Sequence, residues 1–270
     1  MSKKKSFGIL PLIIGAIIIY AAFPEIFEKF FDDNNSNTVN TSPVPAPVSS
    51  VKTKTQTSKP VGTWPYLSDN SQQTSLSPDL LRKNYYVVFD GSGSMSDIGC
   101  SGNRKKIDVA KTALTDFSGH VPSDANLGMM IFDNFGVSER SPLAVNNRSQ
   151  FRSAVMQVYA NRGTPLKSAI TLAFNKLTLQ AKSQLGYGEY NLVVVTDGEA
   201  DAGENPRAIV NKIINDTPIV IHTIGFCINK KHSLNQAGKT IYKSATDVKS
   251  LRQSLQDVLA ESPSFSAQQF

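Results

Sequence analysis

The fold is decided by the stretch Asp90-Gly91-Ser92-Gly93-Ser94-Met95-Ser96, which directly follows an apolar run at residues 85–89 (YYVVF). The apolar run has the length and composition of a buried strand. Beyond the stretch, apolar residues recur at helical spacing and predict a helix over about residues 104–117. A carboxylate and two hydroxyls, spaced Asp-x-Ser-x-Ser, are therefore expected where a strand ends and a helix begins. In an open α/β sheet, ligands bind at that edge.

The side chains of this loop suit a metal ion. The glycines allow the backbone to curl, so that oxygen donors at alternate positions can converge on one cation. Small, hard oxygen ligands in near-octahedral geometry are what Mg²⁺ prefers. Loops rich in Gly and Ser also follow strands in proteins that bind no metal, so this loop alone leaves both interpretations open.

Two further stretches have the same character. Residues 162–166 (RGTPL) open a predicted helix, and a second buried strand at residues 192–196 (LVVVT) ends in Asp197-Gly198-Glu199-Ala200-Asp201. Asp-x-Ser-x-Ser, Gly-Thr-Pro-Leu and Val-Val-Thr-Asp-Gly, in this order, resemble the motifs of a von Willebrand factor A (vWA) domain. The resemblance covers roughly residues 80–260, most of the chain.

The resemblance implies a metal-ion-dependent adhesion site. In that site Ser92, Ser94 and Thr164 would bind a divalent cation directly or through water, Mg²⁺ being expected and Mn²⁺ or Ca²⁺ being alternatives. Asp90 and Asp197 would act largely through water or hydrogen bonds. An Asp or Glu side chain of a partner protein would fill the open coordination position. All five positions of the pattern are present.

Strand and helix signals alternate along the rest of the domain. This alternation predicts a doubly wound, mostly parallel α/β sheet with helices on both faces, similar to vWA and Rossmann-like folds. The predicted strands cover residues 85–89, 126–132, 135–145, 192–196, 219–224 and 241–242. The predicted helices cover residues 104–117 and 149–158, the segment after Thr164, the segment from Pro206 onward, and residues 248–259.

The N-terminal segment, residues 1–31, carries three lysines at positions 3–5 and continues with an apolar run over residues 7–23. Such a run is at the short end of what spans a bilayer. A cleaved signal peptide and an uncleaved signal anchor both fit this pattern. The poor cleavage site at residues 19–22 favours the anchor. A single-pass anchor would keep the N-terminus in the cytoplasm and place the domain outside, in the periplasm or the extracellular space.

Residues 32–79 are rich in Pro, Ser, Thr and Asn and predict a disordered linker. Within it, residues 64–79 can pack on the domain ahead of the first strand. The vWA domain is expected over residues 80–262, followed by a C-terminal tail, 263–270. Half of the formal net charge of +6 lies in the first 63 residues, and no clustered basic stripe follows, so nucleic-acid binding is not expected.

The two cysteines, Cys100 and Cys227, each follow a predicted strand at the same edge of the sheet. Outside the cytoplasm two such thiols are expected to pair, and two buried free thiols are the alternative. Zinc is not expected, because two isolated Cys and three scattered His show no ligand spacing.

An enzyme is not the expected function. The Gly-x-Ser-x-Gly elbow, the P-loop and the dinucleotide-binding fingerprint are absent from the Asp90 stretch. His222 lies inside an apolar strand, which favours a core residue over a catalytic base. A metal-dependent hydrolase or phosphotransferase remains an alternative, and so does a metal-stabilised structural module of an envelope complex.

Charged residues close to the motifs allow simpler interpretations. Glu199 and Asp201 are expected to be solvated rim residues that can contribute to the partner-binding surface. Lys105 and Lys106 are interpreted as the solvated start of a helix. Thr164 can also be the N-cap of its helix, with a proline at the first helical position.

Overall fold

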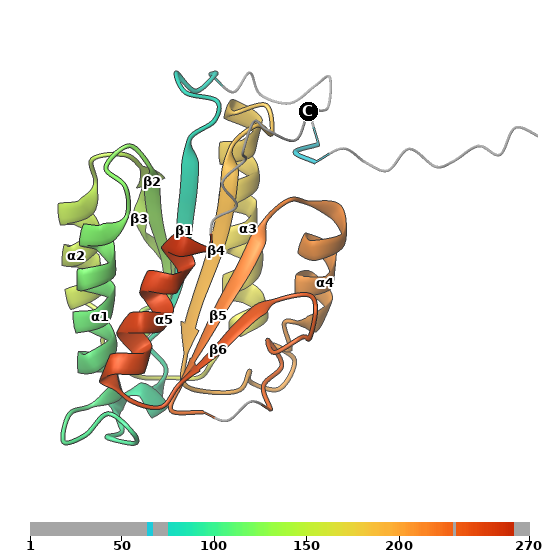
Figure 1. The fold of residues 1–270 in the computed structure, drawn as a ribbon. Coiled ribbons are helices and arrows are strands. Elements are labelled where there is room, and N and C mark those ends of the chain that lie inside the picture. The colour runs from blue at the N-terminus through green and yellow to red at the C-terminus, as the bar shows by residue number, and fades with distance from the viewer. Residues whose placement is uncertain (1–63, 67–74, 229–230, 262–270) are drawn as a thin grey trace, which may run out of the picture. The chain divides into compact units, whose positions relative to one another are not determined.

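The computed structural model describes residues 64–66, 75–228 and 231–261. Within them a six-stranded sheet, of order β3-β2-β1-β4-β5-β6, is covered by helices on both faces (Figure 1). The strands are β1 (Lys83–Asp90), β2 (Asn126–Asp133), β3 (Gly136–Ala144), β4 (Glu189–Thr196), β5 (Val220–Phe226) and β6 (Ile241–Ala245). The helices are the short 3₁₀ helix η1 (Gly93–Ser96) and α1 (Lys106–His120), α2 (Arg148–Met156), α3 (Leu166–Ser183), α4 (Arg207–Asp216) and α5 (Val248–Ala260).

The predicted α/β sheet is confirmed. All neighbouring strands run parallel except β2 and β3, which are antiparallel. On β1, Tyr85, Val87 and Phe89 belong to the core beneath α1, α2 and α5, whereas Tyr86 and Val88 belong to the core beneath α3 and α4. A strand covered by helices on both faces needs no polar side, which explains the unbroken apolar runs in the sequence.

The parallel arrangement brings distant segments of the chain to one edge. Strand β1 lies between β2 and β4, with Phe89 paired to Ile131 on one side and Val195 on the other. The loops after β1 and β4 therefore start at the same level, at the lower edge of the sheet in Figure 1. This carboxyl edge positions the candidate site.

The loop predictions are wrong in two details. Residues 93–96, expected as an open loop, form η1, a 3₁₀ helix that carries Ser94. Helix α3 begins at Leu166 with Pro165 at its N-cap and no side-chain capping bond, so Thr164 is not the cap. The restricted backbone of Pro165, at φ −80° and ψ 62°, lies outside the helical range and moves the start of the helix by one residue.

The predicted anchor (1–31) and tail (263–270) lie outside the described residues. None of the helices within the described ranges is long and apolar enough to cross a membrane. From the predicted linker, Trp64 packs on the domain: its indole N–H donates to Thr178 Oγ1 at 3.1 Å, and its ring meets the Tyr190 ring edge-on, with 4.9 Å between centroids. Tyr190 is at the amino end of β4, so this contact lies at the edge opposite the carboxyl edge.

The predicted disulfide is confirmed. Cys100, in the segment between η1 and α1, is bonded to Cys227, which directly follows β5. The bond links two loops of the carboxyl edge that are 127 residues apart in the sequence. It therefore restrains the segment that leads from the Asp90 stretch into α1.

We expect loss of this disulfide to destabilise the domain. Replacing both cysteines by serine (C100S/C227S) should lower the free energy of unfolding by roughly 2–5 kcal/mol, because the cross-link closes a long loop in the unfolded chain. Urea titration of both proteins measures the change. A reductant should bring the wild type to the stability of the variant and leave the variant unaffected. Two reactive thiols in the denatured, unreduced wild type would contradict the bond.

Candidate metal centre

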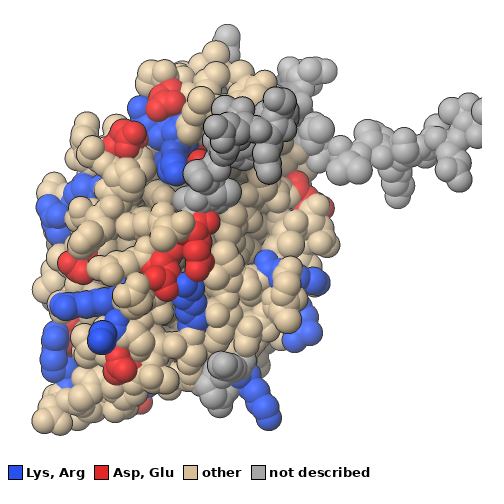
Figure 2. All heavy atoms as spheres, in the orientation of Figure 1, with Lys and Arg blue, Asp and Glu red and all other residues tan. Residues whose placement is uncertain are grey.

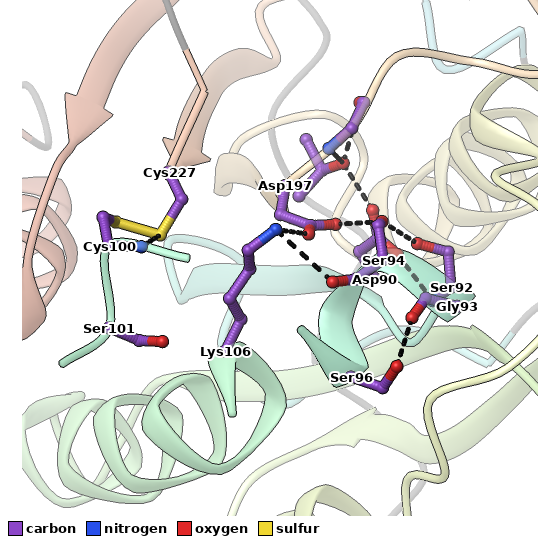
Figure 3. A network of polar contacts seen from close by, with 12 residues as sticks. Asp90, Ser92, Gly93, Ser94, Ser96, Cys100, Ser101, Lys106, Asp197 and Cys227 are labelled. Atoms are coloured by element: carbon purple, nitrogen blue, oxygen red, sulfur yellow. Dashed lines mark hydrogen bonds and ion pairs between the residues drawn. A yellow bond between two sulfur atoms is a disulfide. The ribbon is translucent and has the colours of Figure 1, made fainter. Parts of the chain in front are cut away.

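The hydroxyls of Ser92 and Ser94 meet at the end of β1. Asp90, the last residue of β1, is fully buried, and its Oδ1 accepts a hydrogen bond from the backbone N–H of Ser92 at 2.7 Å. This local bond turns the chain directly into η1. As a result the two serine Oγ atoms lie 3.1 Å apart (Figure 3).

Asp197 joins this cluster from the neighbouring strand. The Ser94 hydroxyl donates to Asp197 Oδ1 at 2.7 Å, and the Asp197 side chain has no solvent exposure. One residue earlier, the hydroxyl of Thr196 donates to Asp90 Oδ2. Two side-chain hydrogen bonds thus connect the segments at the ends of β1 and β4.

The loop that carries Thr164 is fixed to the same cluster through its main chain. The N–H of Asn161 donates to the carbonyl oxygen of Gly91 at 2.9 Å, and the N–H of Gly93 donates to the carbonyl oxygen of Arg162 at 2.9 Å. Between these bonds and α3 the loop has little freedom. It therefore delivers Thr164 to the carboxyl edge beside η1.

The Thr164 and Ser94 hydroxyls both lie near the backbone of Gly198. A Cβ atom built on Gly198 would be 3.6 Å from Ser94 Oγ and 3.9 Å from Thr164 Oγ1, so both oxygens face this glycine. Thr164 is only 6% exposed. Its hydroxyl makes no hydrogen bond to any other described residue, and it is not among the fully buried polar atoms that lack a partner.

Asp201 has a positioning role that the sequence did not reveal. Its Oδ2 accepts a hydrogen bond from the backbone N–H of Thr164 at 2.8 Å. A Cβ on Gly163 would lie 2.0 Å from this oxygen, so only glycine permits the approach. Asp201 is exposed, as expected for a rim residue, and it also holds Thr164 in place. Glu199 is exposed and accepts from the N–H of Ser233 at 3.3 Å.

The arrangement offers oxygen donors only. Ser92, Ser94 and Thr164 supply hydroxyls at the rim, and the carboxylates of Asp90 and Asp197 are buried behind them. Within the described ranges no three His, Cys, Asp or Glu side chains gather as a metal cluster. Hydroxyls and carboxylates suit a hard divalent cation rather than zinc, and the Thr164 hydroxyl, which bonds to no other described residue, is free to bind a ligand.

Burial sets the charge behaviour of Asp90. Removal from water raises the pKa of its carboxyl to about 6, and the charge of the neighbouring Asp197 adds to the increase. Hydrogen bonds from Ser92 and Thr196 oppose this effect. The carboxylate form of Asp90 is thus held in the folded protein at a cost, which a nearby cation would reduce.

The interpretation of Lys106 as a solvated residue is wrong. Lys105 is exposed, but Lys106 is only 8% exposed and its Nζ lies 2.7 Å from Asp197 Oδ2. The same Nζ lies 3.4 Å from the carbonyl oxygen of Ser94. The sequence missed this contact because 91 residues separate the two partners.

No histidine of the described chain is placed as a base for a serine. His222 is buried in β5, where its Nε2 lies 3.3 Å from Asn191 Oδ1. His232 is nearer to the site, but its Nε2 lies 2.7 Å from the carbonyl oxygen of Gly198 and its Nδ1 accepts from the N–H of Leu234. Both ring nitrogens of His232 are therefore occupied.

The raised pKa of Asp90 predicts a pH dependence in the absence of divalent cations. Because the folded-state pKa is above the ordinary value of 3.8, the contribution of Asp90 to stability is complete below about pH 4 and is lost as the pH rises through about 6. In EDTA at pH 7.5, Asp90→Asn should therefore be roughly 1–3 kcal/mol more stable than the wild type. Denaturant titrations at pH 4 and 7.5 measure this difference.

A matched control is Asp97→Asn, which removes an exposed carboxylate from the same segment and should leave the stability unchanged at both pH values. If Asp90→Asn is no more stable than the wild type at pH 7.5, the buried carboxylate does not carry the cost that we assign to it.

Comparisons with known proteins agree with the motifs. Residues 84–261 match the family model of the von Willebrand factor type A domain. The uncharacterized protein YwmD of Bacillus subtilis is 28% identical over 162 residues, covering 55% of this chain and 70% of YwmD.

Solved structures share the fold at low sequence identity. The manganese-loaded TRAP protein of Plasmodium vivax matches with a TM-score of 0.50 and 18% identity, over 67% of this chain and 74% of that one. Proximal thread matrix protein 1 from the mussel byssus matches with a TM-score of 0.52 and 15% identity, over 66% of this chain but only 47% of its own. The family match spans more than half of the sequence, and the chain belongs to the von Willebrand factor type A domain family, whose members commonly mediate protein–protein interaction.

Proposed function

We propose that this chain is a membrane-anchored, extracytoplasmic module that binds a partner protein through a divalent cation. Ser92, Ser94 and Thr164 are proposed to hold the cation, with Asp90 and Asp197 behind them. An Asp or Glu side chain of the partner is proposed to complete the coordination. The process is recognition without turnover.

One observation carries this proposal: the hydroxyls of Ser94 and Thr164, from two separate loops, both lie within 4 Å of one point beside Gly198, and the buried carboxylate of Asp197, from a third loop, lies behind Ser94. Asp197 accepts a hydrogen bond from the Ser94 hydroxyl. The lone pairs of the Ser94 oxygen therefore point away from the carboxylate. A cation held by neutral hydroxyls, with carboxylates at a greater distance, supplies an electrophilic position for an incoming carboxylate.

Mg²⁺ is the cation that we propose, with Mn²⁺ or Ca²⁺ as alternatives. The oxygen-only donor set favours these three over zinc or copper. The structure of the TRAP protein, which shares the fold, holds manganese. The manganese in that structure supports a divalent cation in a domain of this fold. Which cation this chain binds must be measured.

The proposed location rests on residues 1–31, which we expect to anchor the chain in a membrane with its N-terminus in the cytoplasm. The disulfide between Cys100 and Cys227 supports a compartment outside the cytoplasm, because such bonds persist mainly in oxidising environments. Trp64 packs at the edge opposite the hydroxyls, away from the proposed binding rim.

A protein partner fits the surface better than nucleic acid does. On the face drawn in Figure 2, basic and acidic side chains are interspersed over a largely uncharged surface. For example, Lys243 pairs with Asp257 at 2.6 Å and with Glu261 at 2.7 Å. Nucleic-acid binding needs a clustered basic surface. Next to the hydroxyls, the exposed Glu199 is proposed to form part of the partner-binding rim.

The proposal predicts that Ser94→Ala weakens Mg²⁺ binding at least tenfold, since even an outer-shell residue typically contributes 10–100-fold to metal affinity. Isothermal titration of the full-length chain in mild detergent measures it. Ser96→Ala is the matched control: Ser96 lies on the same turn, is exposed, and donates only to the carbonyl oxygen of Gly93. It should bind Mg²⁺ like the wild type.

The same three proteins test partner binding. Immobilised wild type and Ser96→Ala should retain a partner from envelope extracts of the source organism in Mg²⁺ and release it in EDTA, whereas Ser94→Ala should retain none. Retention that EDTA does not affect would argue against binding through a cation. Metal binding without any retained partner would favour the structural module, and turnover of a phosphate or ester substrate would favour the hydrolase.

A further inference from the structure

Lys106 occupies a position that a lysine does not favour. It is the first residue of α1, where the backbone N–H groups and the helix dipole repel positive charge. Its side chain is 11% exposed, although lysine is rarely buried without a partner. Lys105, one residue earlier, is exposed to solvent. The burial of Lys106 therefore needs an explanation beyond the local helix.

The partner that explains this burial belongs to the candidate metal centre. Lys106 Nζ pairs with Asp197 Oδ2 at 2.7 Å, while Asp197 Oδ1 accepts a hydrogen bond from the Ser94 hydroxyl. The two oxygens of one carboxylate thus serve two different groups (Figure 3). The ammonium lies on one side of Asp197 and the hydroxyl cluster on the other, so that both can be present at once.

The loop between η1 and α1 is built around this side chain. Gly99 has a positive φ of 49°, and a Cβ on it would lie 2.5 Å from Lys106 Cε and 3.6 Å from the sulfur of Cys227. The next residue, Cys100, carries the disulfide to Cys227. The loop therefore closes against the lysine stem and is covalently fixed there, which directs the ammonium toward Asp197.

The charges of the site follow from these contacts. The buried charged groups are two carboxylates, Asp90 and Asp197, which lie behind the hydroxyls, and the Lys106 ammonium, which cancels one of their charges. The carboxylate of Asp201 also touches the site but is exposed, so solvent screens it and it is not part of the buried charge. With a divalent cation bound, the group carries a net charge of about +1, and it would be neutral without the lysine. A buried charge so close to the site is poorly screened, and it repels the cation while attracting an anion.

We infer that Lys106 is a built-in positive charge that weakens the affinity of the site for its divalent cation and makes the loaded site selective for an anionic carboxylate ligand. This inference rests on the proposed function and adds a specificity-determining residue to it. The positive charge of the lysine weakens the attraction of the site for the cation. Once the cation is bound, the negative charge of a partner carboxylate brings the site to neutrality.

A positioning role for Lys106 predicts the opposite result. If the ammonium only held Asp197 in place, its removal would disorder the carboxylate and weaken cation binding. If its charge dominates, its removal strengthens cation binding. The sign of the change in affinity therefore separates the two roles. Lys106→Arg, which keeps the charge, should resemble the wild type under our inference.

The experiment measures Mn²⁺ affinity by the electron paramagnetic resonance of free Mn²⁺, with the full-length chain in mild detergent. Lys106→Met keeps most of the length of the side chain and removes its charge, and it should bind Mn²⁺ about tenfold or more tightly than the wild type. Lys105→Met removes the same charge from the exposed neighbouring position, where solvent screens it, and should change the affinity less than about threefold. Thermal unfolding verifies that each variant is folded.

Ser94→Ala in the same titration separates the inference from the proposed function. The wild type can bind Mn²⁺ at least tenfold more tightly than Ser94→Ala while Lys106→Met binds no more tightly than the wild type. In that case the inference about Lys106 is overturned and the proposed metal centre stands. If Ser94→Ala binds Mn²⁺ as tightly as the wild type, or if neither the wild type nor Lys106→Met binds Mn²⁺, the inference and the proposed function are both overturned. Tighter binding by folded Lys106→Met, lost again in the double variant with Ser94→Ala, supports both.

Discussion

The carboxylate of Asp197 ties together the segments on which the candidate site depends. One oxygen accepts the Ser94 hydroxyl from the loop after β1, and the other pairs with the Lys106 ammonium at the start of α1. Because the Asp197 side chain is fully buried, neither interaction competes with bulk water. The buried pairing of β1 with β4 brings Asp197 into reach of the Asp90 stretch. The position of Asp197 therefore depends on the packing of the sheet, and the arrangement of the hydroxyls at the rim depends on Asp197.

Much of this arrangement could be predicted from local sequence patterns. Unbroken apolar runs identified β1 and β4 as central strands, because strands covered on both faces need no polar side. Parallel strands end at a common edge, so Asp90 at the end of β1 and Asp197 after β4 were expected at that edge, and the resemblance to the vWA motifs implied that they share one site. The two cysteines were expected to pair because each follows a strand at this edge and because the N-terminal segment favours a location outside the cytoplasm. The strand signals lie within a few residues of the features that they predict.

Lys106 and Asp201 could not be predicted in this way, because their roles depend on partners far away in the chain. A Lys-Lys pair at a helix start is indistinguishable in sequence from a solvated turn, and only the fold brings one of the two to Asp197, 91 residues later. Asp201 likewise meets the backbone of Thr164 across 37 residues. The one local sign was a lysine at the first turn of a helix, where the dipole disfavours it.

The two hydrophobic cores help to decide whether a bound cation would stabilise the fold or bind a partner protein. One core fills the space between the sheet and α1, α2 and α5, and the other lies beneath α3 and α4. The rim is already joined by main-chain bonds, such as that from Asn161 to Gly91, and by the Cys100–Cys227 disulfide. A structural metal typically replaces a core or a cross-link that a small domain lacks, and this domain lacks neither. A hydroxyl cluster at the rim of a domain that already has two cores and a cross-link is better explained by ligand binding than by stabilisation.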